Sequence, residues 1–146
     1  MFRLQSTLDA AFHRMAHGRD AVIVEGAGGL LVPMAPGVSY EDLCVRWMLD
    51  LLVVAANRLG VINHTALTVR SARRAGLRIV AVVLNTVTTR SPDVAEQTNL
   101  ETLRTLLPGT AVLSFPFVRD PTHIPALVAA AAACGLPSSL PVPVPS

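Results

Sequence analysis

Residues 21–33 read Ala-Val-Ile-Val-Glu-Gly-Ala-Gly-Gly-Leu-Leu-Val-Pro, and this stretch carries the strongest structural signal in the sequence. Its first four residues are apolar and mostly β-branched, which predicts a buried strand over 21–25 with Glu25 at its carboxyl end. Three glycines within the next four positions predict a loop of exposed backbone. Because ligands of parallel α/β sheets bind beyond the carboxyl ends of the strands, Glu25 is expected at a ligand-binding edge.

Two interpretations of Glu25 follow from the residues alone. A carboxylate beside a glycine-rich loop suits a hydrated Mg²⁺ near phosphate groups, with backbone N–H groups approaching the anion. The same residues also fit a tight turn in which Glu25 is merely solvated. The run is not a dinucleotide-binding fingerprint, because G-x-G-x-x-G requires glycine where Leu31 stands and a helix immediately afterwards.

The rest of the chain is expected to alternate between helices and strands. Helical periodicity and glycine or proline breaks predict helices over residues 3–17, 40–48, 62–75, 93–107 and 124–134. Continuous apolar runs predict further strands over residues 51–56, 79–84 and 111–113. We therefore expect an α/β fold with a mostly parallel sheet, formed by one domain over 1–136 and followed by an extended, disordered Pro-rich tail over 137–146.

The composition excludes several classes of protein. Hydrophobic residues make up 51% of the 146 residues and charged residues 15%, which favours a surface buried against a partner or a further segment. No apolar run is long enough to span a bilayer, and the amino terminus has no signal-peptide pattern. Two cysteines without metal-type spacing indicate a reduced, cytoplasmic protein. The net charge is only +2, and the clustered arginines at 70, 73, 74 and 78 fit a solvated helix face better than a nucleic-acid site.

All twelve basic residues other than histidine are arginine, so the sequence contains no lysine. A P-loop of the form G-x-x-x-x-G-K-[ST] is therefore absent from these 146 residues.

Polar residues also follow other predicted elements, and each has two interpretations. Asn63 begins a helix whose amino-terminal N–H groups suit a carboxylate or phosphate, or it is a simple cap. The Asn85 amide follows a strand and matches adenine N6 and N7, or it bonds its own backbone in a turn. Residues 115–117 offer an apolar slot for a base, or ordinary closure of the core. No spacing of Ser, His and Cys suggests a nucleophile triad, so no catalytic residue is assigned.

Four phrases occur in a distinctive order: residues 24–33 (VEGAGGLLVP), 58–68 (RLGVINHTALT), 82–85 (VVLN) and a last strand ending in Phe115-Pro116. Together they resemble the dethiobiotin synthetase family, from about Asp20 to Val118. The matching stretch corresponds to only the carboxyl-terminal part of that family's domain.

The resemblance implies a partial P-loop NTPase-like three-layer fold that lacks the amino-terminal P-loop βα units. It implies a cytoplasmic, homodimeric ligase of biotin biosynthesis that depends on ATP and Mg²⁺. In that family 7,8-diaminononanoate takes up CO₂ as a carbamate, and ATP phosphorylates the carbamate. The second amine then displaces phosphate and closes a cyclic urea.

The resemblance also assigns roles to individual residues. Glu25 would ligate Mg²⁺, and Asn63 would hold the substrate carboxylate from across a homodimer interface. Asn85 with Thr86 would read adenine. The complete ATP site carried over in this way comprises Glu25, Gly26, Ala27, Gly28, Asn85, Thr86, Pro116, Phe117 and Val118, the last three flanking the base.

The family's P-loop, its two functional lysines and a further Mg²⁺ aspartate precede the matching stretch. At roughly 30 residues per βα unit, three missing units amount to about 90 residues. We therefore expect no synthetase activity from this chain alone. Either Met1 is a wrongly chosen start or a break within a full-length enzyme, or the chain is a genuine short product. A short product would be a non-catalytic nucleotide-binding or dimerisation module, or one half of a two-chain ATPase.

Overall fold

The structure is a computed structural model that describes the backbone of residues 2–88 and 94–136. Its helices are α1 (Phe2–Ala16), α2 (Tyr40–Arg46), α3 (Val61–Arg74), α4 (Val94–Leu106) and α5 (Ile124–Ala133). Its strands are β1 (Pro33–Ala35), β2 (Val38–Ser39), β3 (Leu51–Ala56), β4 (Ile79–Asn85) and β5 (Val112–Phe115). The predicted tail over 137–146 lies outside the described residues, and the domain boundaries stay a prediction.

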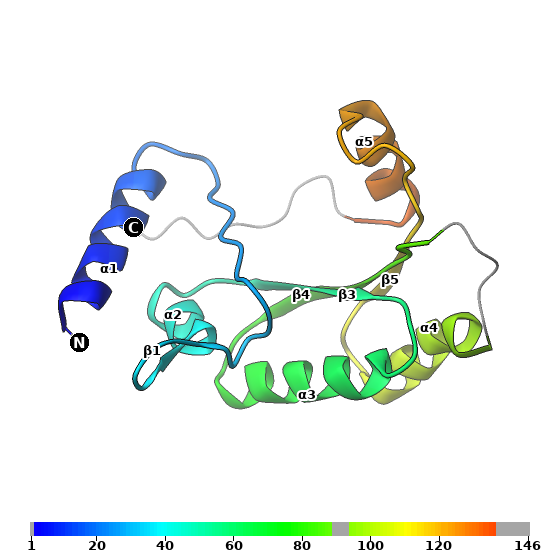
Figure 1. Cartoon of the computed structure of the whole chain (residues 1–146), viewed down its shortest axis with the longest axis horizontal. Helices are drawn as coiled ribbons and strands as arrows, with labels where there is room; N and C mark the ends of the chain where they lie inside the picture. Colours follow the sequence, from blue (N-terminus) through cyan, green and yellow to red (C-terminus); the bar gives the residue numbers. More distant parts are fainter. Residues whose placement is uncertain (1, 89–93, 137–146) are drawn as a thin grey trace.

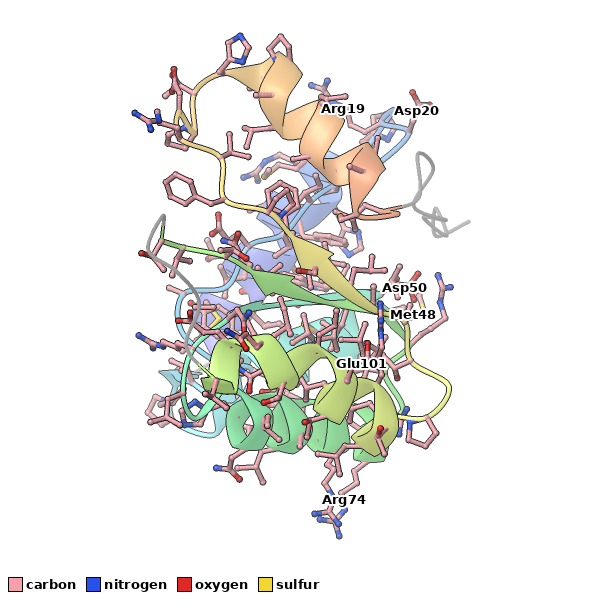
Figure 2. All side chains as sticks on the ribbon, turned by 90° about the vertical axis from the view of Figure 1, so that its right-hand side faces the viewer. Arg19, Asp20, Met48, Asp50, Arg74 and Glu101 are labelled. Atoms are coloured by element: carbon pink, nitrogen blue, oxygen red, sulfur yellow. The ribbon has the colours of Figure 1, made fainter. Side chains whose placement is uncertain are left out.

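Strands β3, β4 and β5 form a parallel sheet with β4 in the centre. Val83 of β4 stands beside Val54 of β3 and Leu113 of β5, so these three residues share one face of the sheet. Helices α3 and α4 cover the opposite face, whereas α5 lies on the other side of the sheet (Figures 1 and 2). The predicted α/β fold with a parallel sheet is thereby confirmed, and the arrangement is consistent with a P-loop NTPase-like fold.

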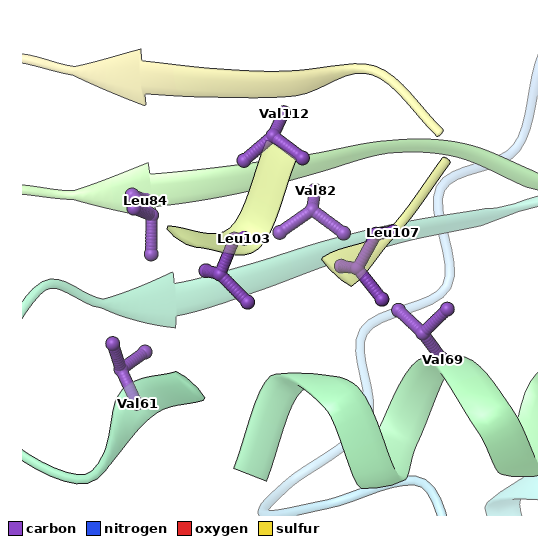
Figure 3. Close-up of a cluster of buried hydrophobic side chains, with 7 residues drawn as sticks. All are labelled: Val61, Val69, Val82, Leu84, Leu103, Leu107 and Val112. Carbon is purple, nitrogen blue, oxygen red and sulfur yellow. The ribbon is translucent and has the colours of Figure 1, made fainter. Parts of the chain in front are cut away.

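The main core lies between the sheet and the helices α3 and α4 (Figure 3). Strand β4 contributes most to it because it has a neighbouring strand on each side, and its residues 81–84 are at most 3% exposed. This burial explains why residues 79–84 read as a continuous apolar run. The buried members of the cluster are Val61, Val69, Val82, Leu84, Leu103, Leu107 and Val112.

A second, smaller core holds the amino-terminal elements together. Phe12 of α1 stacks on Trp47, which directly follows α2, with ring centroids 4.5 Å apart and planes 1° apart. Val38 and Leu43 complete the buried cluster. Helix α2 begins with a capping box, in which the side chain of Ser39 accepts from the Asp42 N–H and the Asp42 carboxylate accepts from the Ser39 N–H.

The predicted buried strand over 21–25 is wrong. The segment has no secondary structure, Ile23 is 87% exposed and Val24 is 43% exposed. Residues 20–28 make no backbone hydrogen bond to any residue in the described part of the chain. A strand needs a neighbouring strand to satisfy its backbone groups, and none of the described strands pairs with residues 21–25. Among the described residues, β3 likewise pairs only with β4, so its other edge has no partner.

The remaining expectations differ from the structure mainly at element ends. The last strand runs over Val112–Phe115 rather than 111–113, because it continues alongside β4 as far as Asn85. The short β1–β2 hairpin was not predicted, although it turns at Gly37 with a left-handed φ of 72°. Within residues 2–88 and 94–136, none of the helices has the length and apolar character needed to cross a membrane.

Candidate functional site

The glycine-rich loop has a shape that larger residues would disturb. Gly28 has a φ of +89°, and a Cβ there would lie 3.0 Å from a methyl group of Val32. A Cβ on Gly26 would lie 3.3 Å from the ring of Tyr40. The loop is tied to the start of α2, since the Glu41 N–H donates to the Leu30 carbonyl over 2.9 Å. Glycine is therefore required at position 28 by both backbone conformation and space.

Glu25 precedes this loop with a freely accessible carboxylate. Its side chain is exposed and makes no hydrogen bond or ion pair with any residue that the structure describes. Within those same residues, no group of three His, Cys, Asp or Glu side chains could together hold a metal ion. At this loop the Glu25 carboxylate is compatible with Mg²⁺, because this ion commonly keeps several waters and binds through one or two carboxylates plus substrate phosphates.

The ends of β4 and β5 bring two predicted groups of residues together. Asn85 is the last residue of β4 and stands beside Phe115 of β5, and the Thr86 N–H donates to the Phe115 carbonyl over 2.9 Å. Residues 116–118 continue directly from that point, and Phe117 is 38% exposed. The amide of Asn85 has no hydrogen-bond partner among the described residues. An open amide and an adjacent exposed ring are the groups needed to bind a nucleotide base.

Helix α3 begins at the same edge of the sheet. Its cap residue is Gly60, with a φ of 90° and no side chain to bond the first N–H groups. Asn63 is an exposed residue of the first turn, where helix N–H groups have no partner within the helix. This end of α3, the loop at Gly28 and the free edge of β3 enclose a hollow of about 380 Å³. Its lining comprises Gly28, Val53, Val54, Ala55, Ala56, Arg58, Val61, His64, Thr65 and Thr68.

One polar group in this hollow lacks a partner. Thr65 is 2% exposed, and its hydroxyl Oγ1 has no hydrogen-bond partner among the described residues. An unpaired buried hydroxyl costs about 1–3 kcal/mol, so a group that bonds it on entering the hollow would be stabilised. The signal in the sequence was weak, because a threonine in the second turn of a helix is ordinary.

A titratable group lies just beyond the base-flanking residues. The side chain of Asp120 accepts hydrogen bonds from the Thr122 hydroxyl (2.7 Å) and the Thr122 N–H (2.9 Å). These bonds, led by that of the hydroxyl, lower the pKa of the Asp120 carboxyl below its ordinary value. They also shape the turn that carries the chain from Val118 into α5.

The predicted site residues therefore fall into two groups. Asn85, Thr86 and 116–118 lie together at the ends of β4 and β5, while Gly28 lies beside the start of α3. Within the described residues, Glu25 and Asn85 share no hydrogen bond or ion pair. The hydrogen-bonded pair formed by half-exposed Asn57 and buried Asn99 was not predicted from the sequence. The available signal was an asparagine in the apolar stripe of helix α4.

The chain is similar to known proteins over most of its length. A family described as "AAA domain" matches residues 3–123. An ATP-dependent dethiobiotin synthetase of Halalkalibacterium halodurans is 38% identical over 110 residues, covering 74% of this chain and 45% of the relative. The same-named protein of Anaeromyxobacter sp. (strain Fw109-5) is 54% identical over 71 residues, covering 49% and 32%. That of Aquifex aeolicus is 36% identical over 99 residues, covering 68% and 44%.

The chain matches 32–45% of the length of these relatives, which is less than half of each. The similarity confirms the resemblance to dethiobiotin synthetases, with partial coverage. From the match over residues 3–123, the chain belongs to the AAA domain family, and its curated relatives there are dethiobiotin synthetases.

Proposed function

We propose that residues 1–146 form the part of an ATP-dependent dethiobiotin synthetase that binds the adenine base and the substrate carboxylate. The observation that carries this proposal is the junction of β4 and β5, where the Thr86 N–H bonds the Phe115 carbonyl over 2.9 Å. That bond supports the proposal because it ties the residue after Asn85 to the residue before 116–118, and an amide with an apolar ring suits an adenine base. Asn85 and Thr86 would read its edge, while Pro116, Phe117 and Val118 flank its ring.

The metal and the phosphates belong to the other group of residues. Glu25 would hold Mg²⁺ through its carboxylate, and Gly26, Ala27 and Gly28 would let backbone approach the phosphates. Mg²⁺ supplies positive charge that offsets the charge of the transferring phosphoryl group. Asn63, in the open first turn of α3, would hold the substrate carboxylate through free N–H groups and the positive end of the helix.

The reaction of the whole enzyme would be the carboxylation and ring closure of 7,8-diaminononanoate, with CO₂ and ATP as the other substrates, in a cytoplasmic homodimer. Residues 1–146 would bind nucleotide without turning it over. Phosphoryl transfer relies on cationic groups around the γ-phosphate, and the sequence contains no lysine. The alternative is a non-catalytic nucleotide-binding or dimerisation module. Such a module would use the same residues for binding, but it would not combine with a segment that carries a P-loop.

The test is Mg²⁺-dependent binding of ATP to the purified chain, followed by calorimetry for the wild type and Glu25→Gln. Because a charge-assisted ligand is removed, we expect the variant to bind Mg-ATP about tenfold more weakly or worse, with metal-free ATP binding unchanged. Glu101→Gln is the matched control, since Glu101 lies exposed on α4. Equal affinities in Glu25→Gln and wild type contradict the metal role.

A second arm separates the enzyme from the binding module. The chain is mixed with Mg-ATP, the diamine and bicarbonate, and phosphate release is measured. We expect no release from residues 1–146 alone. Release above background would overturn the inference drawn from the missing lysine.

A further inference from the structure

The sheet-facing side of α4 changes character along its length. Leu103 and Leu107, at and just beyond its carboxyl-terminal end, are at most 3% exposed and belong to the main core. Near the amino-terminal end, the corresponding positions hold Glu96, 8% exposed, and Asn99, 2% exposed. Residues three and four apart share one face of a helix, so these two polar residues share the face with Leu100, which packs against the main core. Burying an amide without a hydrogen bond is costly, which makes its bonding partners informative.

The buried amide of Asn99 bonds the turn that follows β3. Its Nδ2 donates to Oδ1 of Asn57 over 2.8 Å and to the carbonyl of Arg58 over 3.4 Å. The amide of Asn57 donates in return to the backbone carbonyl of Glu96 over 3.1 Å. The two amides therefore fasten the first half of α4 to the end of β3 at two points.

The same chain of bonds continues into the candidate base site. The backbone N–H of Asn57 donates to the carbonyl of Asn85 over 2.9 Å, one residue beyond the paired strands β3 and β4. From there the Thr86 N–H reaches the Phe115 carbonyl. Four elements are thus linked through successive bonds at one edge of the sheet: α4, β3, β4 and β5. The side chain of Asn85, at the middle of this line, is unbonded within the described residues.

We propose that Asn99, acting through Asn57, is a positioning residue that holds the end of β4 where Asn85 can read a nucleotide base. The inference rests on the proposed function, because it takes Asn85 as the group that contacts the base. A leucine at position 99 would continue the apolar stripe of α4 but would supply no donor to Asn57. The amide is thus the group that links the helix to the site.

The first test measures hydrogen exchange of backbone amides by NMR in the wild type and Asn99→Leu. Losing one hydrogen bond should speed exchange at Asn57 and Thr86 by about fivefold relative to the amide of Val69 in the core. Leu107→Ala is the matched control, because it weakens the same face of the α4 region away from Asn57. This control should change the exchange rates of the Asn57, Thr86 and Val69 amides by similar factors. An unchanged ratio in Asn99→Leu overturns the proposal.

Asn57→Ala breaks the same link from a half-exposed position, so it provides a second variant if Asn99→Leu does not fold. This variant should also speed hydrogen exchange of the Thr86 amide relative to that of the Val69 amide. Unaltered relative exchange at Thr86 in this variant counts against the proposal in the same way.

The second test asks whether the link affects recognition of the base. Affinities for Mg-ATP and Mg-GTP are compared in wild type, Asn99→Leu and Leu107→Ala. We expect the ATP preference to fall about fivefold in Asn99→Leu and to stay constant in Leu107→Ala, whose loss is one of stability alone. Local loosening without a change of preference shows that Asn99 is only structural, and overturns the proposal.

These measurements also separate this inference from the proposed function. If the wild-type chain binds neither nucleotide, the proposed function fails and the base-reading role fails with it. The exchange ratios then still decide whether Asn99 positions the end of β4, with a localised change supporting that coupling and a uniform one overturning it.

Discussion

Two runs in this chain have the same apolar composition but differ in secondary structure and burial. Residues 79–84 (IVAVVL) form most of β4, the central strand, whereas residues 21–24 (AVIV) form no strand. Val82 is fully buried, but Ile23 is 87% exposed. The difference lies in their neighbours: β4 has a strand on each side, and no described strand lies beside 21–24. An apolar run becomes a strand only where other strands complete its hydrogen bonds.

This comparison extends to the candidate site. Asn85 ends the packed strand β4 and is held by backbone bonds to both neighbouring strands. Glu25 follows the unpaired run and has no bonding partner in the described residues. The proposed base-binding residues therefore follow hydrogen-bonded strands, whereas the proposed metal ligand follows a run that pairs with no described strand. If both proposals hold, we expect binding of the base to be less sensitive to the surroundings than binding of the metal.

The largest expected effect concerns the packed half of the chain, which comprises β3, β4, β5, α3 and α4 around the main core. Leu103→Ala removes a side chain that is 0% exposed between α4 and the sheet, and should lower the free energy of unfolding by about 3 kcal/mol. Leu106→Ala, three residues along the same helix and 52% exposed, should lower it by less than about 0.5 kcal/mol. Urea denaturation followed by circular dichroism measures both. Similar losses in the two variants would show that α4 does not pack through Leu103.

Much of the packed half could be predicted from the sequence, because local pattern and tertiary structure agree there. The strand over 51–56 has the predicted bounds, and helix 62–75 differs from α3 by one residue at each end. The amino-terminal half is less predictable. A strand at 21–25 depends on a partner that no pattern within the run can reveal, and a hairpin as short as β1–β2 has too few residues for a period to show.

The site divides in the same way. Asn63 and Asn85 could be proposed from the sequence because each lies at the end of a clearly predicted element, Asn63 in the first turn of α3 and Asn85 at the end of β4. Asn99 could not be assigned a role, since its partner Asn57 lies 42 residues away in sequence. Thr65 carried no distinguishing sequence signal either, because its unpaired hydroxyl is a property of packing. The contacts that could not be predicted from the sequence were therefore hydrogen bonds between residues far apart in the chain.

The amino-terminal half should respond to acid in a way that the main core does not. Asp9 of α1 accepts hydrogen bonds from the Trp47 indole and from Arg46, each over 2.8 Å. The Trp47 bond, followed by the Arg46 contacts, lowers the pKa of the Asp9 carboxyl below its ordinary value of 3.8. Because the folded pKa is the lower one, this attachment of α1 is complete above about pH 3.8 and weakens as the pH falls through the folded value.

Trp47 is the single tryptophan of the chain, so its fluorescence reports this attachment. The emission should change below about pH 3.8, and Asp9→Asn should resemble the acid state already at neutral pH. The Ser39 bonds also lower the pKa of Asp42, so only the difference between wild type and variant belongs to Asp9. Identical titrations of the two proteins would mean that Asp9 does not hold α1.

The smallest expected effect tests the unpaired run directly. Val→Thr keeps the shape of the side chain and adds a hydroxyl, whose burial without a partner costs about 1–3 kcal/mol. At Val82, 0% exposed in β4, the change should lower the free energy of unfolding by that amount. At Val24, 43% exposed, it should lower it by less than about 0.5 kcal/mol, because water can bond the new hydroxyl. Equal losses at the two positions, measured by urea denaturation, would show that residues 21–24 are buried in solution and that the contrast between the two runs is wrong.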